Sequence, residues 1–453
     1  MSRRPAWQKI YERFDPQEPA RAEERADRPR SPAADILEEL DLPFGLPRVL
    51  LTGTVGTGKS TELIRVAEER AGADFTVLLD LHRHFSLVVG DEHALRRVSS
   101  WEVVFLAGLA VIRAASEVLP YPIPQAQIDA LAIAWTKLAK ATDTPHATID
   151  IATLAKSMLV LGSAAIPLLG ATPSAASTAA TGALTVFKAA ADSVKWTLPI
   201  GRGKKTIADQ DAEMQSLLMA VNAIVGYVQT KSRRILLVID GLDRIDDLEH
   251  AKSLFLRSEL IAQLGCPVVV CGPFALRSHP AASAVPRFSK ITALVNEPVL
   301  DHDDPRMPGP GVQFFCDLYD RRVADLGADL VPRPLLERLA YYSGGRARDF
   351  VKSIRILAQR AYTADAEQAT DALVKKVLDE ARHLLETGLD AGHIDVLAAV
   401  AKDTLHLLPA DGRARDLLSY GQLLPYPNES EWYYPHPLLT MSLVRTSRTG
   451  SSG

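Results

Sequence analysis

A glycine-rich segment near the N-terminus carries the clearest chemistry in the chain. It reads Gly53-Thr54-Val55-Gly56-Thr57-Gly58-Lys59-Ser60 and fits the pattern G-x-x-x-x-G-K-[ST] at every position. A polyphosphate needs several backbone N–H donors at close range, and glycines allow the positive φ angles and the close approach that such a cradle requires. We therefore predict that this segment, the phosphate loop, binds a nucleoside triphosphate.

The polar residues of the phosphate loop have separate expected roles. Lys59 supplies a positive charge for the β- and γ-phosphates, and the Ser60 hydroxyl ligates Mg²⁺. The helix expected to begin here adds the partial positive charge of its N-terminus. We therefore expect ATP and Mg²⁺ as ligands. The predicted nucleotide-binding residues are Gly53, Thr54, Val55, Gly56, Thr57, Gly58, Lys59, Ser60 and Thr61.

A second motif follows the apolar run 235–239 and reads Asp240-Gly241-Leu242-Asp243-Arg244. Ligands collect at the carboxyl ends of parallel strands, so an acidic residue at that position suits a partner of Mg²⁺. We predict that Asp240 is the second metal ligand beside Ser60. Asp243 is expected to orient or deprotonate the attacking water; in the alternative, it only caps a turn.

Compact apolar runs predict the strands that must position these motifs. Such runs, bounded by polar residues, are typical of strands buried on both faces of a parallel sheet. The five predicted strands are RVLLTG ending at Gly53, FTVLLDL at 75–81, ILLVI at 235–239, CPVVVCGP at 266–273 and ITALVNEPVL at 291–300. A helix pattern, TELIRVAEERAG, follows the phosphate loop. The order strand, loop, helix, strand predicts an α/β fold with three layers.

The composition excludes some classes of protein. The chain has 453 residues, of which 23% are charged and 47% are apolar, and its net charge is −4. These values are ordinary for a globular protein, and they give no overall basic field for nucleic acid or an anionic membrane. Its three cysteines have no metal-ligand spacing, and the first residues lack the apolar stretch of a secretory signal. We expect a cytoplasmic protein with reduced cysteines.

The remaining pattern predicts how the chain divides into domains. After residue 311 the buried strand runs give way to helices, and near the C-terminus helices precede a hairpin expected to turn at 428–430. Helices followed by a hairpin indicate a winged-helix-like domain. The predicted parts are an N-terminal arm at 1–35, a P-loop ATPase core at 36–300 with a helical insert at about 99–205, a helical lid at 301–385, a winged-helix-like domain at 386–445 and a flexible tail at 446–453.

At the two phosphate motifs the sequence resembles the P-loop ATPases with an extra central strand, the group that contains AAA+ and STAND proteins. The segment Asp240–Arg244 resembles the motif of STAND signal-transduction ATPases, which carry a second acid three positions after the first, and is similar to that of KAP ATPases. The resemblance covers roughly residues 30–385. It implies a three-layer ATPase core, a helical lid and a conformational switch driven by ATP hydrolysis. A typical AAA+ protein has Glu where Gly241 stands, which favours a slow switch over a processive motor.

The resemblance also implies two arginine sites. Arg277 follows the strand 266–273 closely, where a polar residue senses the γ-phosphate in this group; the alternative is a surface arginine on a loop. The segment Ser343-Gly344-Gly345-Arg346-Ala347-Arg348-Asp349 resembles a lid motif whose arginine folds over the nucleotide. Arg348 or Arg346 would then close on the phosphates, although a glycine pair also serves as a plain helix boundary.

An unusual segment lies between the two phosphate motifs. Residues 157–187 contain no charge, but glycines and prolines interrupt their apolar part, which is shorter than the roughly 20 residues of a membrane-spanning helix. KAP ATPases carry membrane segments in this interval. We therefore keep two alternatives, contact with a membrane and a buried or self-associating helical hairpin.

We expect an ATPase whose nucleotide state controls oligomerisation or an effector protein, as in bacterial defence or signalling. One alternative is an initiator-like ATPase that acts on DNA through its winged helix, with Arg413, Arg415 and the hairpin 424–434 as contacts. Aspartates accompany these arginines and the wing is acidic, so nucleic acid is not the favoured partner. The other alternative is a membrane-associated, KAP-like ATPase.

Overall fold

The computed structural model describes residues 3–140, 151–158, 160–162, 211–277, 287–326, 329–427 and 431–442. The chain divides into two compact units, which we treat separately. The sheet unit comprises Ser31–Gly53 and Lys59–Ala293, and the lid unit comprises Met1–Arg30, Thr54–Gly58 and Leu294–Gly453. The middle of the phosphate loop thus belongs to the lid unit, whereas the residues on both sides of it belong to the sheet unit.

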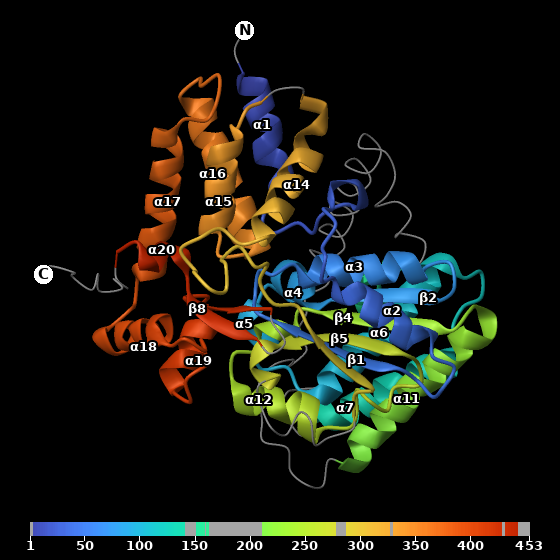
Figure 1. Ribbon diagram of the computed structural model, residues 1–453. Coiled ribbons are helices and arrows are strands. Elements are labelled where there is room, and N and C mark those ends of the chain that lie inside the picture. The colour runs from blue at the N-terminus through green and yellow to red at the C-terminus, as the bar shows by residue number, and fades with distance from the viewer. Residues whose placement is uncertain are drawn as a thin grey trace, which may run out of the picture. The chain divides into compact units, whose positions relative to one another are not determined.

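A six-stranded sheet forms the centre of the sheet unit (Figure 1). Five strands are parallel, and they are the five predicted from the apolar runs. The sixth, β3, pairs antiparallel with β2 at one edge. In spatial order the strands are β3 (Val160–Gly162), β2 (Phe75–Asp80), β4 (Ile235–Asp240), β5 (Val268–Pro273), β1 (Arg48–Gly53) and β6 (Lys290–Ala293). The predicted α/β fold class is confirmed.

The position of β5 decides the type of sheet. It pairs with β1 on one side and with β4 on the other, so one strand separates the phosphate-loop strand from the strand that ends at Asp240. This is the extra central strand that the motif resemblance implied. Because the strands are parallel, their carboxyl ends lie on the same side of the sheet. Gly53, Asp80 and Asp240 are all at these carboxyl ends.

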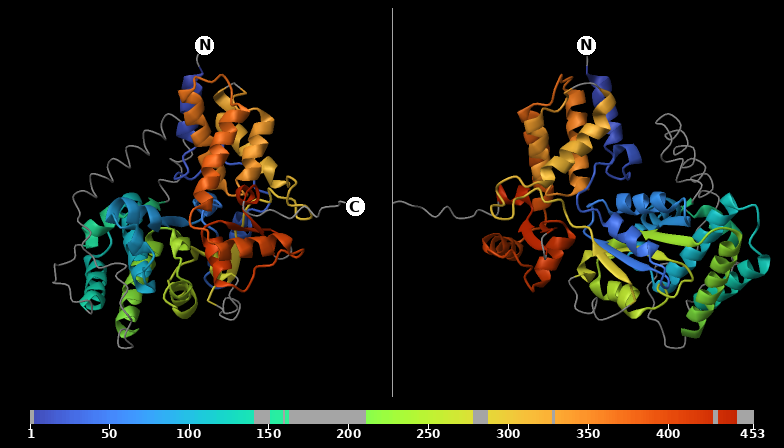
Figure 2. Two further views of the ribbon diagram at one scale, coloured as in Figure 1. Left: turned by 90° about the vertical axis from the view of Figure 1, so that its left-hand side faces the viewer. Right: turned by 45° about the vertical axis from the view of Figure 1, so that its right-hand side comes forward.

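Helices cover both faces of the sheet (Figures 1 and 2). On one face, α2 and α3 pack against each other and against the strands. On the other face, α6 and α11 lie together on β2 and β4, with α7 and α8 packed outside them. The helices of this unit are α2 (Pro32–Asp41), α3 (Lys59–Arg70), α4 (Leu81–His84), α5 (Glu92–Leu95), α6 (Ser100–Val118), α7 (Gln125–Lys140), α8 (Ile151–Ser157), α11 (Asp211–Lys231) and α12 (Leu248–Lys252).

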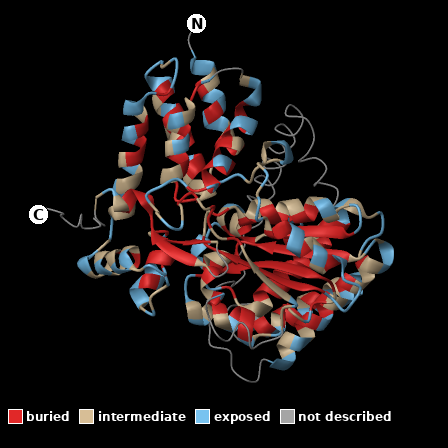
Figure 3. Ribbon diagram, in the orientation of Figure 1, coloured by how far each residue is buried: buried red, intermediate tan, exposed pale blue. Residues whose placement is uncertain are grey.

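The strands β1, β4 and β5 are buried on both faces, as continuous apolar runs predict, whereas β6 is only partly buried (Figure 3). Alternate residues of β2 and β4 pack in one hydrophobic cluster with α6 and α11. The members from these two strands are Phe75, Val77, Leu79, Ile235, Leu237 and Ile239. Burial on this scale holds the ends of β2 and β4, and hence Asp80 and Asp240, in fixed positions.

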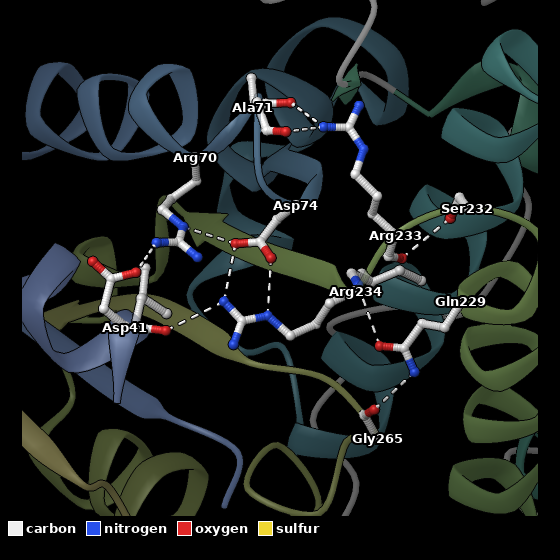
Figure 4. Close-up of polar contacts among 12 residues, drawn as sticks. Asp41, Arg70, Ala71, Asp74, Gln229, Ser232, Arg233, Arg234 and Gly265 are labelled. Atoms are coloured by element: carbon white, nitrogen blue, oxygen red, sulfur yellow. Dashed lines mark hydrogen bonds and ion pairs between the residues drawn. The ribbon is translucent and has the colours of Figure 1, made fainter. Parts of the chain in front are cut away.

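An ion-pair network links the amino ends of β2 and β4 to the neighbouring helices (Figure 4). Asp74, which is 2% exposed, accepts hydrogen bonds from Arg70 Nε at 2.8 Å and Arg234 Nε at 2.9 Å. Arg70 also pairs with Asp41, and Arg234 Nη2 donates to the Leu40 carbonyl at 3.2 Å. These contacts join the ends of α2 and α3 to the starts of β2 and β4. Asp80 and Asp240 lie at the other ends of these two strands.

Two predictions about strands need correction. The strand predicted at 291–300 ends at Ala293, because the backbone beyond it bonds elsewhere: Asn296 N donates to Pro425 O at 3.2 Å, and Glu297 N donates to Gly345 O at 3.0 Å. Within the uncharged segment, Val160–Gly162 forms the strand β3 and not a helix. Most of that segment, 163–187, lies outside the described residues. Of the helices in the described ranges, none has the length and apolar character that crossing a membrane requires.

The lid unit is mainly helical. Its helices are α1 (Arg4–Arg13), α14 (Gly311–Val323), α15 (Arg333–Tyr342), α16 (Ala347–Thr363), α17 (Asp371–Glu386), α18 (Ala391–Lys402), α19 (Gly412–Ser419) and α20 (Pro437–Thr440). A two-stranded antiparallel sheet, β7 (Leu423–Tyr426) with β8 (Trp432–Pro435), follows α19. The predicted C-terminal hairpin is therefore present, while its expected turn at 428–430 and the predicted tail at 446–453 lie outside the described residues.

The start of the chain packs into this unit. Residues 4–13 of the predicted N-terminal arm form a helix. Its side chains Trp7 and Ile10 are fully buried together with Phe14. Trp7 Nε1 donates to the Ala366 carbonyl at 2.7 Å. These aromatic residues share a cluster with Phe315 and others from α14 to α17, so the N-terminal segment is part of the lid's core.

Candidate functional site

The phosphate loop leaves β1 at Gly53 and enters α3 at Lys59. Gly56 has a φ of +97° and Gly58 a φ of +102°, a region that residues with a side chain rarely occupy. The Thr57 hydroxyl donates to the Thr54 carbonyl at 3.0 Å and closes the turn. The geometry is thus that of a tight, left-handed loop that opens directly onto a helix N-terminus, as the glycine spacing predicted.

In the sheet unit, Lys59 and Asp243 form a buried ion pair. Lys59 Nζ lies 2.8 Å from Asp243 Oδ2, and it also donates to the Gly53 carbonyl at 2.9 Å. The side chains are 3% and 11% exposed. The lysine is therefore held across the base of the loop by a carboxylate and a carbonyl, both of which a phosphate can replace as hydrogen-bond acceptors.

Ser60 and Asp240, the two predicted metal ligands, also meet. The Ser60 hydroxyl donates to the Asp240 carboxylate, whose Oδ1 also accepts from Gly241 N at 2.7 Å. Burial, and then the nearby Asp243 carboxylate, raise the pKa of Asp240. Neighbouring hard oxygens from a hydroxyl and a carboxylate are suitable ligands for Mg²⁺. Thr61, the other predicted contact in this turn of α3, is partly exposed.

Cys271 lies beside these acids on β5. Its sulfur and the carboxylate oxygens of Asp240 and Asp243 all lie within 4.8 Å of one another. Burial raises the pKa of Cys271 well above its ordinary value, so the thiol keeps its proton. A protonated soft ligand does not suit Mg²⁺, so the oxygens of Ser60 and Asp240 stay the predicted metal ligands.

Asp80 is a site residue that the sequence reasoning missed. It ends β2 and is the direct neighbour of Asp240 in the parallel register. Burial, together with the charge of Asp240, raises the pKa of Asp80 to about 7. A signal was available, because FTVLLD ends in an acid in the same way as ILLVID. The carboxyl groups of Asp80 and Asp240 are therefore neighbours at the carboxyl ends of β2 and β4.

The structure gives a physical reason for Gly241. Its φ is +96°, and a Cβ at this position would lie 2.7 Å from the backbone nitrogen of His82. A glutamate, which typical AAA+ proteins carry here, would therefore need both a strained backbone and a displaced α4. In this chain the second acid is Asp243, in the short turn Leu242–Arg244.

In the lid unit, the predicted arginine motif contacts the middle of the loop. Arg346 Nη2 donates to the Val55 carbonyl at 2.7 Å, and its Nη1 pairs with Asp349 at 2.8 Å. The backbone N–H of Arg348 donates to the Gly56 carbonyl at 3.0 Å. Arg346 therefore meets the loop through its side chain, whereas Arg348 meets it through its backbone.

The glycine pair before these arginines lies where other segments cross closely. A Cβ on Gly345 would be 2.0 Å from the Glu297 carbonyl oxygen, and one on Gly344 would be 2.5 Å from Leu424. The Tyr426 hydroxyl donates to the Gly344 carbonyl at 2.9 Å. The motif is thus more than a helix boundary, because it touches the phosphate loop, the segment before α14 and the C-terminal hairpin.

Replacing Gly345 by alanine should strongly destabilise the lid unit. Gly388 has a similar φ, +85° against +79°, but open space around it, so Gly388→Ala is a matched control. The control should lose about 1–2 kcal/mol through backbone strain, and Gly345→Ala about 1–3 kcal/mol more through overlap with Glu297. Denaturant unfolding measures both. Equal losses would contradict the close crossing.

Arg277 follows the turn Phe274–Leu276 after β5 and is exposed. Arg277 thus follows the strand that lies between β1 and β4 in the sheet. Its role as a sensor of the γ-phosphate stays a prediction.

A cavity of about 1000 Å³ in the lid unit is a competing ligand site. It lies between α16, α17 and the C-terminal elements. Its charged lining is mixed, with Arg346 and Lys352 beside Asp349 and Glu380. A mixed lining does not favour a polyanion, so the phosphate loop stays the predicted nucleotide site.

Comparison with known proteins adds little to this picture. No family model matches the sequence, and no curated protein matches it. Among solved structures, the chain is similar to the Aeropyrum pernix ORC2 protein in its ADP form, with 13% identity, a TM-score of 0.41 and 94% of each chain covered. It is similar to Cdc6p from Pyrobaculum aerophilum, with 14% identity, a TM-score of 0.36 and 96% of each chain covered. It is also similar to the Thermotoga maritima RuvB Holliday junction branch migration motor, with 13% identity and a TM-score of 0.26. That match covers 51% of this chain and 82% of the RuvB chain. Similarity of this extent says nothing about what the chain binds.

Proposed function

We propose that this chain binds ATP with Mg²⁺, hydrolyses it slowly and acts as a regulatory switch of the STAND or AAA+ type. The observation that carries the proposal is the phosphate loop itself. Two glycines in left-handed conformation precede a lysine and a serine, and each of these two side chains contacts one acid of the Asp240–Arg244 motif. Chance glycine-rich turns do not bring these four side chains together.

The residues at the loop fit both ligands. The backbone N–H groups of Gly56, Thr57 and Gly58, with Lys59, would hold the phosphates. Ser60 and Asp240 would hold Mg²⁺, which when bound neutralises the charge that develops on the phosphate oxygens. The hydrogen bond between these two side chains keeps both oxygen ligands close together before any ligand arrives.

For hydrolysis we assign Asp243 the task of orienting and deprotonating the attacking water. Its carboxylate pairs with Lys59 and would be released when the lysine turns to the phosphates. Gly241 stands where typical AAA+ proteins carry a glutamate. The absence of that glutamate supports a slow reaction. Asp80, next to Asp240, adds a second acid near the same place.

The lid contacts support a switch. Arg346 links the Val55 carbonyl to the helix α16, and the preceding Gly344 carbonyl accepts from Tyr426 in the C-terminal hairpin. A change in the loop when the γ-phosphate binds or leaves would therefore shift α16 and the C-terminal hairpin together. We propose that this movement controls assembly with other copies or with an effector protein, in bacterial defence or signalling.

Particle size tests the switch. Light scattering or sedimentation should give a different mass for the wild type with Mg²⁺ and ATP than without nucleotide, because the lid contacts would change on binding. Lys59→Ala, which should not bind ATP, is the matched control and should keep one mass. An identical mass in all four samples would contradict control of self-assembly and would leave an effector protein as the target to seek.

A second candidate function is binding of DNA through the C-terminal domain. Its motivation is the order of α18, α19 and the hairpin β7–β8, together with the exposed Arg415 on α19. Against it, Asp411 and Asp416 flank the exposed Arg413 and Arg415 and offset their positive charges. A shift assay on random duplex at several salt concentrations separates the two functions, since binding that weakens steeply with salt would support DNA.

A further inference from the structure

Three successive carbonyl groups of the phosphate loop accept hydrogen bonds from the rest of the lid unit. Val55 O accepts from Arg346 and Gly56 O from the backbone of Arg348. The third, Thr57 O, accepts from Arg28 Nη2 at 2.9 Å. Arg28 comes from the charged N-terminal segment, outside both phosphate motifs.

These bonds determine where the loop's N–H groups point. In a trans peptide the carbonyl and the following N–H point in opposite directions, and the chain has no cis peptide bond in the described residues. Each carbonyl fixed on the outside of the loop therefore turns the next N–H, of Gly56, Thr57 or Gly58, to the inside. A row of N–H groups facing one way is a site for an anion.

Arg28 is held in a defined orientation. Its Nε lies 2.9 Å from Glu297 Oε1, and the two side chains are 5% and 8% exposed. The guanidinium also lies over the Phe314 ring, 5.0 Å from its centre. A buried arginine paired in this way has little freedom, so its Nη2 presents one direction to Thr57.

Gly58 follows the carbonyl that Arg28 holds. Its φ of +102° lies in the left-handed region, which favours glycine. A Cβ there would be in ordinary van der Waals contact with Arg28 Nη2, 3.4 Å away, so the backbone conformation, and not the space for Arg28, calls for glycine at this position.

We propose that Arg28, oriented by Glu297, is a positioning residue of the phosphate loop. It holds the Thr57 carbonyl so that the Gly58 N–H is aimed at a bound phosphate before ATP arrives. The proposal rests on the ATP site proposed above and adds the N-terminal segment to it. Loss of Arg28 should then cost ATP affinity and should loosen the loop in the absence of nucleotide.

Two measurements on the full chain test this role. The first is the dissociation constant for ATP with Mg²⁺, and the second is hydrogen exchange of the peptide covering residues 53–60 without nucleotide. Arg28→Gln should weaken ATP binding about tenfold to a hundredfold, the range for a hydrogen bond to a charged group, and should speed exchange in this peptide. Arg30→Gln, an exposed arginine two residues away, should change neither.

Further variants separate positioning from charge and from folding. Arg28→Lys keeps the charge but not the fork that reaches Glu297 and Thr57 together, so it should behave like Arg28→Gln; wild-type affinity in Arg28→Lys would overturn the proposal. Arg28→Gln leaves the Glu297 carboxylate buried without its arginine, and the pair Arg28→Gln with Glu297→Gln removes that charge. If the double variant regains wild-type affinity, the defect was the buried carboxylate and the proposal fails.

The two proposals fail in distinguishable ways. If the wild type binds no ATP, the proposed function is wrong, and the exchange measurement alone decides whether Arg28 restrains the loop. If the wild type binds ATP and Arg28→Gln binds it within twofold, the proposed function stands and the positioning role is wrong.

Discussion

Replacing Lys59 by alanine abolishes measurable ATP binding. Lys59 is the one cation of the loop itself, and the residue is 4% exposed. Its ammonium group is already held in place by the Gly53 carbonyl and the Asp243 carboxylate. Charge-assisted hydrogen bonds to phosphates are among the strongest in proteins. With about 1.5–3 kcal/mol for each such bond, loss of contacts to two phosphates lowers affinity by roughly a hundredfold or more.

Equilibrium dialysis with ATP and Mg²⁺ measures this loss. Arg65→Ala is a matched control, because Arg65 lies on the same helix but pairs with Glu69 at the exposed surface. The control should bind like the wild type and keep its melting temperature, whereas Lys59→Ala should melt at a lower temperature because it leaves the largely buried Asp243 carboxylate without its cation. Binding by Lys59→Ala within threefold of the wild type would contradict the assigned role.

Replacing Asp243 by asparagine preserves ATP binding but slows hydrolysis by about a hundredfold or more, the usual contribution of a general base. Asparagine has nearly the same shape, but it cannot accept the proton of the attacking water. It also removes the carboxylate that competes with the phosphates for Lys59, 2.8 Å away. The ATP affinity of Asp243→Asn should therefore equal or exceed that of the wild type.

Single-turnover hydrolysis and ATP binding must be measured on the same samples. Asp246→Asn is the control, since Asp246 lies three residues further on and forms an exposed pair with Arg96. It should leave both quantities unchanged. Two results would count against the assignment: a wild-type hydrolysis rate in Asp243→Asn, or loss of binding as severe as in Lys59→Ala.

Much of the sheet unit could be predicted, because apolar runs and glycine spacing are local signals. All five parallel strands and the phosphate loop followed from them. The strand β3 was missed since it has three residues in a segment without charge or periodicity, and its partner β2 is remote in sequence. The strand β6 was predicted too long because apolar residues continue to Val295 and return at Val299 and Leu300. Between them, Asn296 and Glu297 bond to Pro425 and Gly345 and not to the sheet.

The site was predictable only where residues are close in sequence. Spacing alone brought Lys59 and Ser60 together, and the rule for strand ends brought in Asp240 and should have brought in Asp80. Arg28 itself lies in a charged segment without a periodic pattern, and a sequence separation of 29, which includes α2 and β1, divides it from Thr57. Such contacts are set by tertiary packing, so sequence pattern does not reveal them.

The same limit applies to the lid. The motif Gly344–Arg348 indicated an arginine near the phosphates, but the pattern did not tell which arginine would use its side chain. In the structure, Arg346 reaches Val55 O with its guanidinium, 291 residues away in sequence, while Arg348 uses its backbone. Left-handed glycines at 344 and 345 turn the chain just before these arginines.

Titration calorimetry of ATP into the wild-type protein with Mg²⁺ tests the central claim most directly. The glycine loop, Lys59 and the oxygen ligands Ser60 and Asp240 predict one site per chain, with binding weakened when Mg²⁺ is removed by a chelator. If folded protein at millimolar ATP and Mg²⁺ gives no heat at any of several temperatures, and other nucleoside triphosphates give none either, the loop is not a nucleotide site and the switch built on it is wrong.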